Sequence, residues 1–182
     1  MVYSMRIYVD GACRHNGKPW AKGVSACVIK NRNSGYKGWT RLLPLNPRPT
    51  NQRTEIDAII LALEQALQRY EELNGYPSLD VLIHSDSRYA VNCMEDWVYK
   101  WSSNGWLNTR GEEVVNRDII QKASGLDDEL KELGSVSYVW IPREENGEAD
   151  GLCNERLDKE EREEREQENN RYTSDDSDDY YY

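Results

Sequence analysis

Residues 5–11, MRIYVDG, alternate apolar and polar side chains and include an acidic residue, Asp10, after the last apolar position. This alternation of β-forming residue types predicts a strand that ends at Asp10. Residues 22–31 and 36–43 have a similar β-rich composition and are joined by NRNSG, a turn sequence. Three consecutive antiparallel strands are therefore predicted at the start of the chain.

The middle of the chain changes to helical spacing. Residues 55–70, EIDAIILALEQALQRY, repeat apolar side chains along one helical face, and Thr50 or Asn51 is placed to cap this helix. The apolar segment 79–84 follows the helix, so we expect a strand parallel to the first. The later elements are predicted as a helix over 87–101, a loop over 102–112, a helix over 114–133 that Gly125 could break, a strand over 136–141 and a helix from Glu145.

These elements predict an α/β fold with a mixed five-stranded sheet and helices on both faces. We expect one domain over residues 1–158 and a charged tail over 159–182 that is helical at first and then disordered. The tail carries ten acidic and four basic residues, of 33 and 23 in the 182-residue chain. Neither part has the basic excess of a tight, sequence-independent nucleic-acid binder. An enzyme whose metal ions meet the phosphates stays compatible with this charge.

The sequence also carries information on the cellular compartment of the protein. It has no run of 18 apolar residues, and its N-terminus lacks the features of a signal peptide. Its four cysteines are scattered and form no CxxC motif, which favours reduced thiols. We therefore expect an intracellular monomer, in the cytoplasm or nucleus, with no membrane partner.

Four acidic residues occupy positions where core packing has no use for a carboxylate. Asp10 ends the first predicted strand, Asp86 follows the fourth, and Glu55 and Asp150 lie near the starts of helices. Adjacent parallel strands would put Asp10 and Asp86 side by side. Carboxylates buried together repel one another unless hard divalent cations such as Mg²⁺ or Mn²⁺ neutralise them. The pattern predicts a metal site suited to phosphate chemistry.

The order of these acidic blocks resembles that of type 1 ribonuclease H. The resemblance covers roughly residues 5–158, and WVYKWSSNGW at 97–106 looks like the family's helix and basic protrusion. It implies an endonuclease that hydrolyses the RNA strand of an RNA–DNA hybrid and leaves 3′-hydroxyl and 5′-phosphate ends. The four blocks are DGA at 10–12, TNQRTE at 50–55, SDS at 85–87 and EAD at 148–150.

The resemblance implies catalysis by two Mg²⁺ ions, with Mn²⁺ as an alternative. Two such ions, roughly 3.5–4 Å apart, would hold the scissile phosphate, one activating a water and the other stabilising the leaving oxygen. Asp10 would bridge both ions. The positions that match the family's catalytic metal ligands are Asp10, Glu55, Asp86 and Asp150.

The resemblance also implies contacts to an RNA–DNA hybrid as the partner. Some of these residue types have structural explanations that the sequence leaves open, namely loop and helix-cap chemistry for the minor-groove residues and core packing for the tryptophans. The matching positions are Asn16, Asn51 and Gln52 in the minor groove, Arg48, Thr50 and Asn116 at a DNA phosphate, and Trp97 and Trp101 against deoxyribose.

The sequence departs from the family pattern in WIPREENGEAD, residues 140–150. The loop before the last acidic residue is short, and Glu144 stands where family members often carry a histidine. We expect this change to slow turnover without abolishing hydrolysis, and Glu144 or Glu145 could hold a metal-bound water instead. We also hypothesise that the acidic tail folds back on the basic groove and competes with substrate.

Two other functions stay open at this point. One is a related nuclease that acts on another duplex, such as double-stranded RNA or DNA. The other is a nucleic-acid-binding module of the same fold with weak or no catalysis. The four carboxylates argue against the second, because binding alone gains nothing from negative charge facing phosphates.

Overall fold

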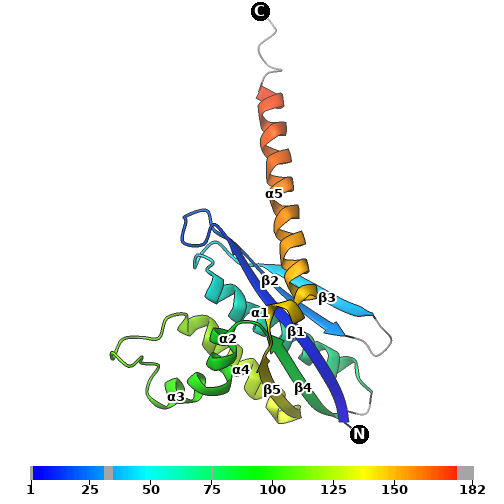
Figure 1. Cartoon of the computed structure of the whole chain (residues 1–182), viewed down its shortest axis with the longest axis vertical. Coiled ribbons are helices and arrows are strands. Elements are labelled where there is room, and N and C mark those ends of the chain that lie inside the picture. The colour runs from blue at the N-terminus through cyan, green and yellow to red at the C-terminus, as the bar shows by residue number, and fades with distance from the viewer. Residues whose placement is uncertain (1, 31–34, 75, 176–182) are drawn as a thin grey trace, which may run out of the picture.

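The computed structural model describes residues 2–30, 35–74 and 76–175. Its centre is a five-stranded sheet with the strand order β3-β2-β1-β4-β5 (Figure 1). β1 pairs antiparallel with β2, which pairs antiparallel with β3, whereas β4 is parallel to β1 and β5 is parallel to β4. The predicted mixed sheet is confirmed. Its strands are β1 (Val2–Arg14), β2 (Lys22–Lys30), β3 (Tyr36–Leu42), β4 (Ser78–Ser85) and β5 (Gly134–Trp140).

Helices cover both faces of this sheet. α1 and α4 lie on one side, and α5 crosses the other side and then projects beyond the body (Figure 1). The helices are α1 (Asn51–Glu72), α2 (Arg88–Asn92), α3 (Val98–Ser103), α4 (Arg117–Leu133) and α5 (Gly147–Asp175). A π-helical turn (Cys93–Trp97) joins α2 to α3, and a 3-10 turn (Arg143–Glu145) precedes α5.

The apolar stripe of α1 explains how the main core forms. Ile56, Ile59, Ile60 and Leu63 are fully buried against the sheet, as the helical spacing predicts. A smaller cluster on the opposite face packs α5 against β2. Burying both faces fixes the strand register, because a shift by one residue would turn every side chain to the wrong face.

Several element boundaries differ from the prediction. β1 continues past Asp10 to Arg14, because its pairing with β2 extends to the Arg14–Lys22 pair. α1 begins at Asn51 with Thr50 as its cap, so Glu55 lies in its second turn. α4 runs through Gly125 without a break, since one glycine costs a helix only about 1 kcal/mol.

Parts of the tail lie beyond the structural description. α5 crosses from residue 158 to 159 without interruption, and the separation of a tail at that point stays a prediction. The disorder expected at the end of the chain concerns residues 176–182, and most of the NRNSG turn falls on residues 31–34; both lie outside the described residues. Among the described helices, none combines the length and apolar character needed to cross a bilayer.

Candidate active site

Three of the four predicted carboxylates converge where β1 passes the carboxyl end of β4. Asp10 lies on β1, Asp86 directly follows β4, and Glu55 lies on α1. One carboxylate oxygen of each lies within 4.8 Å of the others. The sheet register explains this meeting, because Val9 pairs with Ser85 and so the next residue along each strand is an aspartate.

A glycine allows Glu55 to approach Asp10. A Cβ atom on Gly11 would lie 2.3 Å from the carbonyl carbon of Thr54 and 2.4 Å from the amide nitrogen of Glu55. Any larger residue would therefore push the start of α1 away from β1. The Asp-Gly pair thus supplies both a carboxylate and the space that brings a second carboxylate beside it.

Asp150 joins these residues from the first turn of α5. It lines a pocket of about 330 Å³ together with Asp10, Glu55 and Asp86, and we call this the carboxylate pocket. The Asp150 carboxylate pairs with the Arg143 guanidinium at 2.9 Å. It also accepts a 3.1 Å hydrogen bond from the Asn154 side-chain amide. Asp150 therefore pairs with a cation, and its carboxylate is also hydrogen-bonded within α5.

Burial and mutual repulsion disfavour negative charge in the carboxylate pocket. Desolvation, then the charges of Asp86 and Asp150, raise the pKa of Asp10 to about 6. Desolvation, then the charges of Asp10 and Asp86, raise the pKa of Glu55 well above its ordinary value. The buried Oε2 of Glu55 has no hydrogen-bond partner in the described part of the chain.

These observations fit a divalent cation. A buried carboxylate oxygen without a partner and a set of repelling oxygen donors are what a hard cation would satisfy. The positive charge of Arg143 lowers the pKa of both Asp10 and Glu55, but its side chain is 77% exposed. A solvated guanidinium at the rim compensates the buried oxygens only weakly. The pocket has the chemistry of a metal site.

Two residues that the sequence analysis did not single out support the carboxylates. The Asn146 side-chain amide, 1% exposed, donates to the Val9 carbonyl at 2.9 Å and to the Asp86 carboxylate at 3.0 Å. The Cys153 thiol lies 3.3 Å from the Asp10 carbonyl oxygen. Asn146 therefore ties the ends of β1 and β4 to the start of α5. Its only signal in the sequence is an Asn-Gly pair, which by itself indicates a turn.

Arg143, and neither of the glutamates that follow it, lines the carboxylate pocket. Glu144 and Glu145 lie in the same 3-10 turn and are exposed. The hypothesis that one of them holds a metal-bound water gains no support from this placement. The short loop before Asp150 thus places the Arg143 guanidinium, and not a glutamate, at the pocket.

The candidate minor-groove residues form a polar ridge beside the carboxylate pocket. Asn16, in the loop after β1, accepts a 3.4 Å hydrogen bond from the Asn51 backbone amide. Gln52 accepts a 3.4 Å hydrogen bond from the Asn116 side chain, which also donates to the Tyr89 hydroxyl at 3.2 Å. Three separate segments of the chain therefore meet along this ridge.

The three candidates for a DNA phosphate have different surroundings. The Thr50 hydroxyl accepts a 3.2 Å hydrogen bond from the Arg53 backbone amide and so caps α1. Asn116 has a left-handed backbone, with φ of 64°, immediately before α4. Arg48 is exposed and forms no ion pair within the described ranges. A cap and a turn therefore explain part of this set without any ligand.

The candidate tryptophans belong to a continuous aromatic row. The Trp97 and Trp101 ring centroids lie 5.6 Å apart, and Tyr89 and Trp106 extend the row at 6.0 Å and 6.3 Å. Both tryptophans are partly buried against the main core. One side of each indole packs against the protein, so both core packing and a surface role remain compatible with this position.

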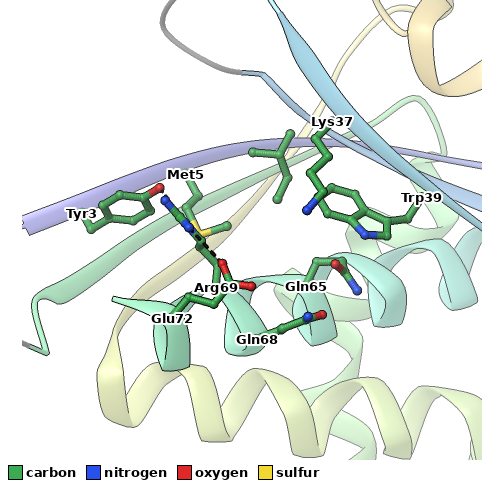
Figure 2. Close-up of a pocket in the computed structure, with 9 residues that line it drawn as sticks. Tyr3, Met5, Lys37, Trp39, Gln65, Gln68, Arg69 and Glu72 are labelled. Atoms are coloured by element: carbon green, nitrogen blue, oxygen red, sulfur yellow. Dashed lines mark hydrogen bonds and ion pairs between the residues drawn. The ribbon is translucent and has the colours of Figure 1, made fainter. Parts of the chain in front are cut away.

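A second pocket lies at the opposite end of α1 and contains none of the candidate residues. It has a volume of about 200 Å³, and Figure 2 shows Tyr3, Trp39, Lys37 and Arg69 around it. The Arg69 guanidinium is already bonded to the Tyr3 hydroxyl at 3.0 Å and to Glu72 at 2.9 Å. The acidic cluster therefore distinguishes the carboxylate pocket from this one.

Comparisons with known proteins agree with this geometry. The RNase H family model matches residues 3–166. A relative named ribonuclease H, from Nitrosomonas eutropha, is 32% identical over 156 residues, which cover 85% of each chain. The RNase H1 crystal structure from the archaeon Halobacterium salinarum has a TM-score of 0.57 at 25% identity, covering 86% of this chain and 99% of that one.

A further structural neighbour shares the fold. It is the foamy viral protease–reverse transcriptase in complex with an RNA/DNA hybrid, with a TM-score of 0.66 at 21% identity. The alignment covers 84% of this chain and 20% of the viral one.

Proposed function

The chain belongs to the ribonuclease H family, whose members hydrolyse the RNA strand of RNA–DNA hybrids with divalent metal ions, and we propose that it does so at the carboxylate pocket. The proposed ligands of two Mg²⁺ ions, with Mn²⁺ as a substitute, are Asp10, Glu55, Asp86 and Asp150. The proposed products carry 3′-hydroxyl and 5′-phosphate ends.

One observation carries this proposal. The oxygens of Asp10, Glu55 and Asp86 meet within 4.8 Å, although they come from three separate elements. Such an arrangement lowers the stability of the folded protein unless a cation binds. Asp150 adds a fourth oxygen donor at the rim of the pocket, where Arg143 is its partner in the absence of a metal.

The chain's own residues have separate tasks in hydrolysis. Bound divalent ions would supply the positive charge that stabilises the attacked phosphate and lowers the pKa of the attacking water. Asp10 and Glu55 would hold these ions at the desolvated part of the pocket, where electrostatic interactions are stronger than in water. Asn146 fixes the orientation of Asp86 through its amide, so that the carboxylate does not turn away.

The polar ridge and the aromatic row supply substrate selection. We propose that Asn16, Asn51 and Gln52 contact the two strands in the minor groove, where the 2′-hydroxyl distinguishes RNA from DNA. Trp97 and Trp101 would pack against deoxyribose, where a 2′-hydroxyl would clash. Arg48, Thr50 and Asn116 would hold a phosphate of the DNA strand.

A gel assay tests the proposal. An end-labelled RNA–DNA hybrid, an RNA duplex and a DNA duplex are each incubated with Mg²⁺, with Mn²⁺ or with EDTA. We expect cleavage of the RNA strand in the hybrid only, with either cation and not with EDTA. Cleavage of another duplex at an equal rate would contradict the substrate assignment, and cleavage in EDTA would contradict the metal site.

A further inference from the structure

Two basic residues face each other across the β1–β2 hairpin, next to the carboxylate pocket. Arg14 and Lys22 are direct cross-strand partners, and their side chains are only 28% and 21% exposed. Two like charges in this position repel each other unless acidic groups lie close by. Arg14 also lines the carboxylate pocket itself.

One face of α5 supplies the acidic groups. The Arg14 guanidinium pairs with Asp158 at 2.5 Å and with Glu161 at 2.9 Å, and the Lys22 ammonium pairs with Glu164. These three acids are spaced by three residues and so lie on one side of the helix. They follow the part of α5 that packs on the sheet, where Leu157 is the last buried residue. We call Asp158, Glu161 and Glu164 the acidic clamp.

The clamped cations lie where the carboxylate pocket adjoins a second hollow. Arg14 lines both this pocket and a larger groove of about 1110 Å³, which Lys22, Trp20 and Glu164 also line. Arg14 is four residues beyond Asp10 on the same strand, or roughly 13 Å. Backbone phosphates a few nucleotides from the cleavage point would therefore come near the clamped cations.

We propose that Arg14 and Lys22 are contacts for backbone phosphates of the hybrid, and that the acidic clamp competes with those phosphates for them. This inference rests on the proposed function. Charged side chains exchange partners readily at a partly exposed site, because such ion pairs contribute little net stability. When substrate enters, phosphates replace the carboxylates; when product leaves, the clamp closes again.

This role differs from the tail hypothesis drawn from the sequence. In the described part of the chain, α5 projects away from α3 and does not fold back over it (Figure 1). The competition acts instead at the β1–β2 hairpin, where Arg14 and Lys22 pair across the two strands. A purely structural role for the three ion pairs is the alternative that the experiment must separate.

The test compares two triple variants of the full chain. The first, Asp158→Asn/Glu161→Gln/Glu164→Gln, removes the acidic clamp. The matched control, Glu155→Gln/Glu163→Gln/Glu166→Gln, changes the net charge of α5 equally but touches neither Arg14 nor Lys22. Binding of a fluorescent hybrid is measured in EDTA at several salt concentrations, and thermal melting verifies folding.

We expect the clamp variant to bind the hybrid about three- to tenfold more tightly than the control, since two cations, freed from three ion pairs, become available to phosphates. The slope of log K against log[salt] should steepen by about 1 to 2, because two more cations release counterions. Adding Arg14→Gln and Lys22→Gln to the clamp variant should remove the gain.

Equal affinity and equal salt slope in the two triple variants would overturn the inference and leave the ion pairs a structural role. Weaker binding by the clamp variant would also overturn it, because the acids would then position the cations for substrate. The hybrid cleavage assay distinguishes a failure of the proposed function, since wild-type protein that does not cut the hybrid fails there regardless of these variants.

Discussion

The molecule holds two groups of acidic residues with opposite surroundings. In the carboxylate pocket, Asp10 and Glu55 are desolvated and their pKa values are raised. In the acidic clamp, each carboxylate faces a cation, and the hydrogen bond from Arg14 lowers the pKa of Glu161. The first group costs folding free energy until a cation binds, whereas the second is already neutralised. Acidic residues thus indicate a cation site where their charges are desolvated and repel one another, and not where each already faces a cation.

The largest effect should come from a substitution in the carboxylate pocket, with the same kind of substitution in the acidic clamp as its control. Asp10→Asn removes a carboxylate from the meeting point of three elements, and we expect hybrid cleavage to fall at least a hundredfold, the scale for loss of an electrostatic group in an active site. Asp158→Asn should not lower the rate. Steady-state cleavage rates with saturating Mg²⁺ measure both. Near-normal cleavage by Asp10→Asn would erase the contrast between the two groups.

The pH dependence of stability should separate the two groups next. The folded-state pKa of Asp10 is raised to about 6 from an ordinary 3.8, so the folded protein holds this proton more tightly than the unfolded chain does. The resulting stabilisation is complete below pH 3.8 and is lost as pH rises to about 6. It amounts to about 3 kcal/mol, and Glu55 acts in the same direction.

Urea unfolding in EDTA at pH 4.5 and pH 7 measures this effect. Asp10→Asn should gain stability relative to wild type at pH 7 and lose that advantage at pH 4.5. The pKa of Glu161 is lowered in the wild type, so Glu161→Gln should show no gain in stability at pH 7. A parallel pH profile for wild type and Asp10→Asn would show that Asp10 carries no electrostatic penalty.

Asn146 connects the carboxylates to the body of the protein, and its removal should have a mid-sized effect. Asn146→Ala leaves the buried Val9 carbonyl without its side-chain donor, so we expect a loss of about 1–3 kcal/mol in the free energy of unfolding. Asn154→Ala, at an exposed position on α5, is the control and should change stability by less than about 0.5 kcal/mol. Equal losses of unfolding free energy in Asn146→Ala and Asn154→Ala would show that Asn146 does not connect the carboxylates to the body of the protein.

The smallest expected change concerns the cation at the rim of the carboxylate pocket. Arg143→Gln removes a positive charge that pairs with Asp150 and opposes cation binding, so about two- to fivefold less Mg²⁺ should give half-maximal cleavage. Arg156→Gln, which breaks an ion pair with Glu160 inside α5, should leave the Mg²⁺ requirement unchanged. A higher Mg²⁺ requirement for Arg143→Gln would mean that Arg143 assists the site.

Local sequence patterns were enough to predict the sheet and the meeting of the acidic residues. Asp10 and Asp86 follow apolar runs, and the parallel pairing of β1 with β4 places them side by side, although β1 continues past Asp10. Glu55 needed more than a pattern, because its approach depends on Gly11 lying against the backbone of Thr54. The Asp-Gly pair contains that information, but only the packing of β1 on α1 reveals it.

Arg143 and Asn146 could not be predicted, because their roles depend on the path of a short loop. Which of the charged residues in PREEN faces the pocket is decided by a 3-10 turn that the sequence does not specify. Likewise, Arg14 on β1 pairs with Asp158 on α5, 144 positions further along the chain. The composition of α5 around Asp158 indicates only a solvated surface. Long-range contacts between charged side chains leave no periodic signal in a sequence.

Calorimetric titration of Mn²⁺ into metal-free protein at pH 7 tests the central claim most directly, namely that the buried and repelling carboxylates form a cation site. We predict saturable binding by the wild type, strong weakening in Asp10→Asn, and binding indistinguishable from wild type in Asp158→Asn. Equal Mn²⁺ binding by wild type and Asp10→Asn would contradict the account.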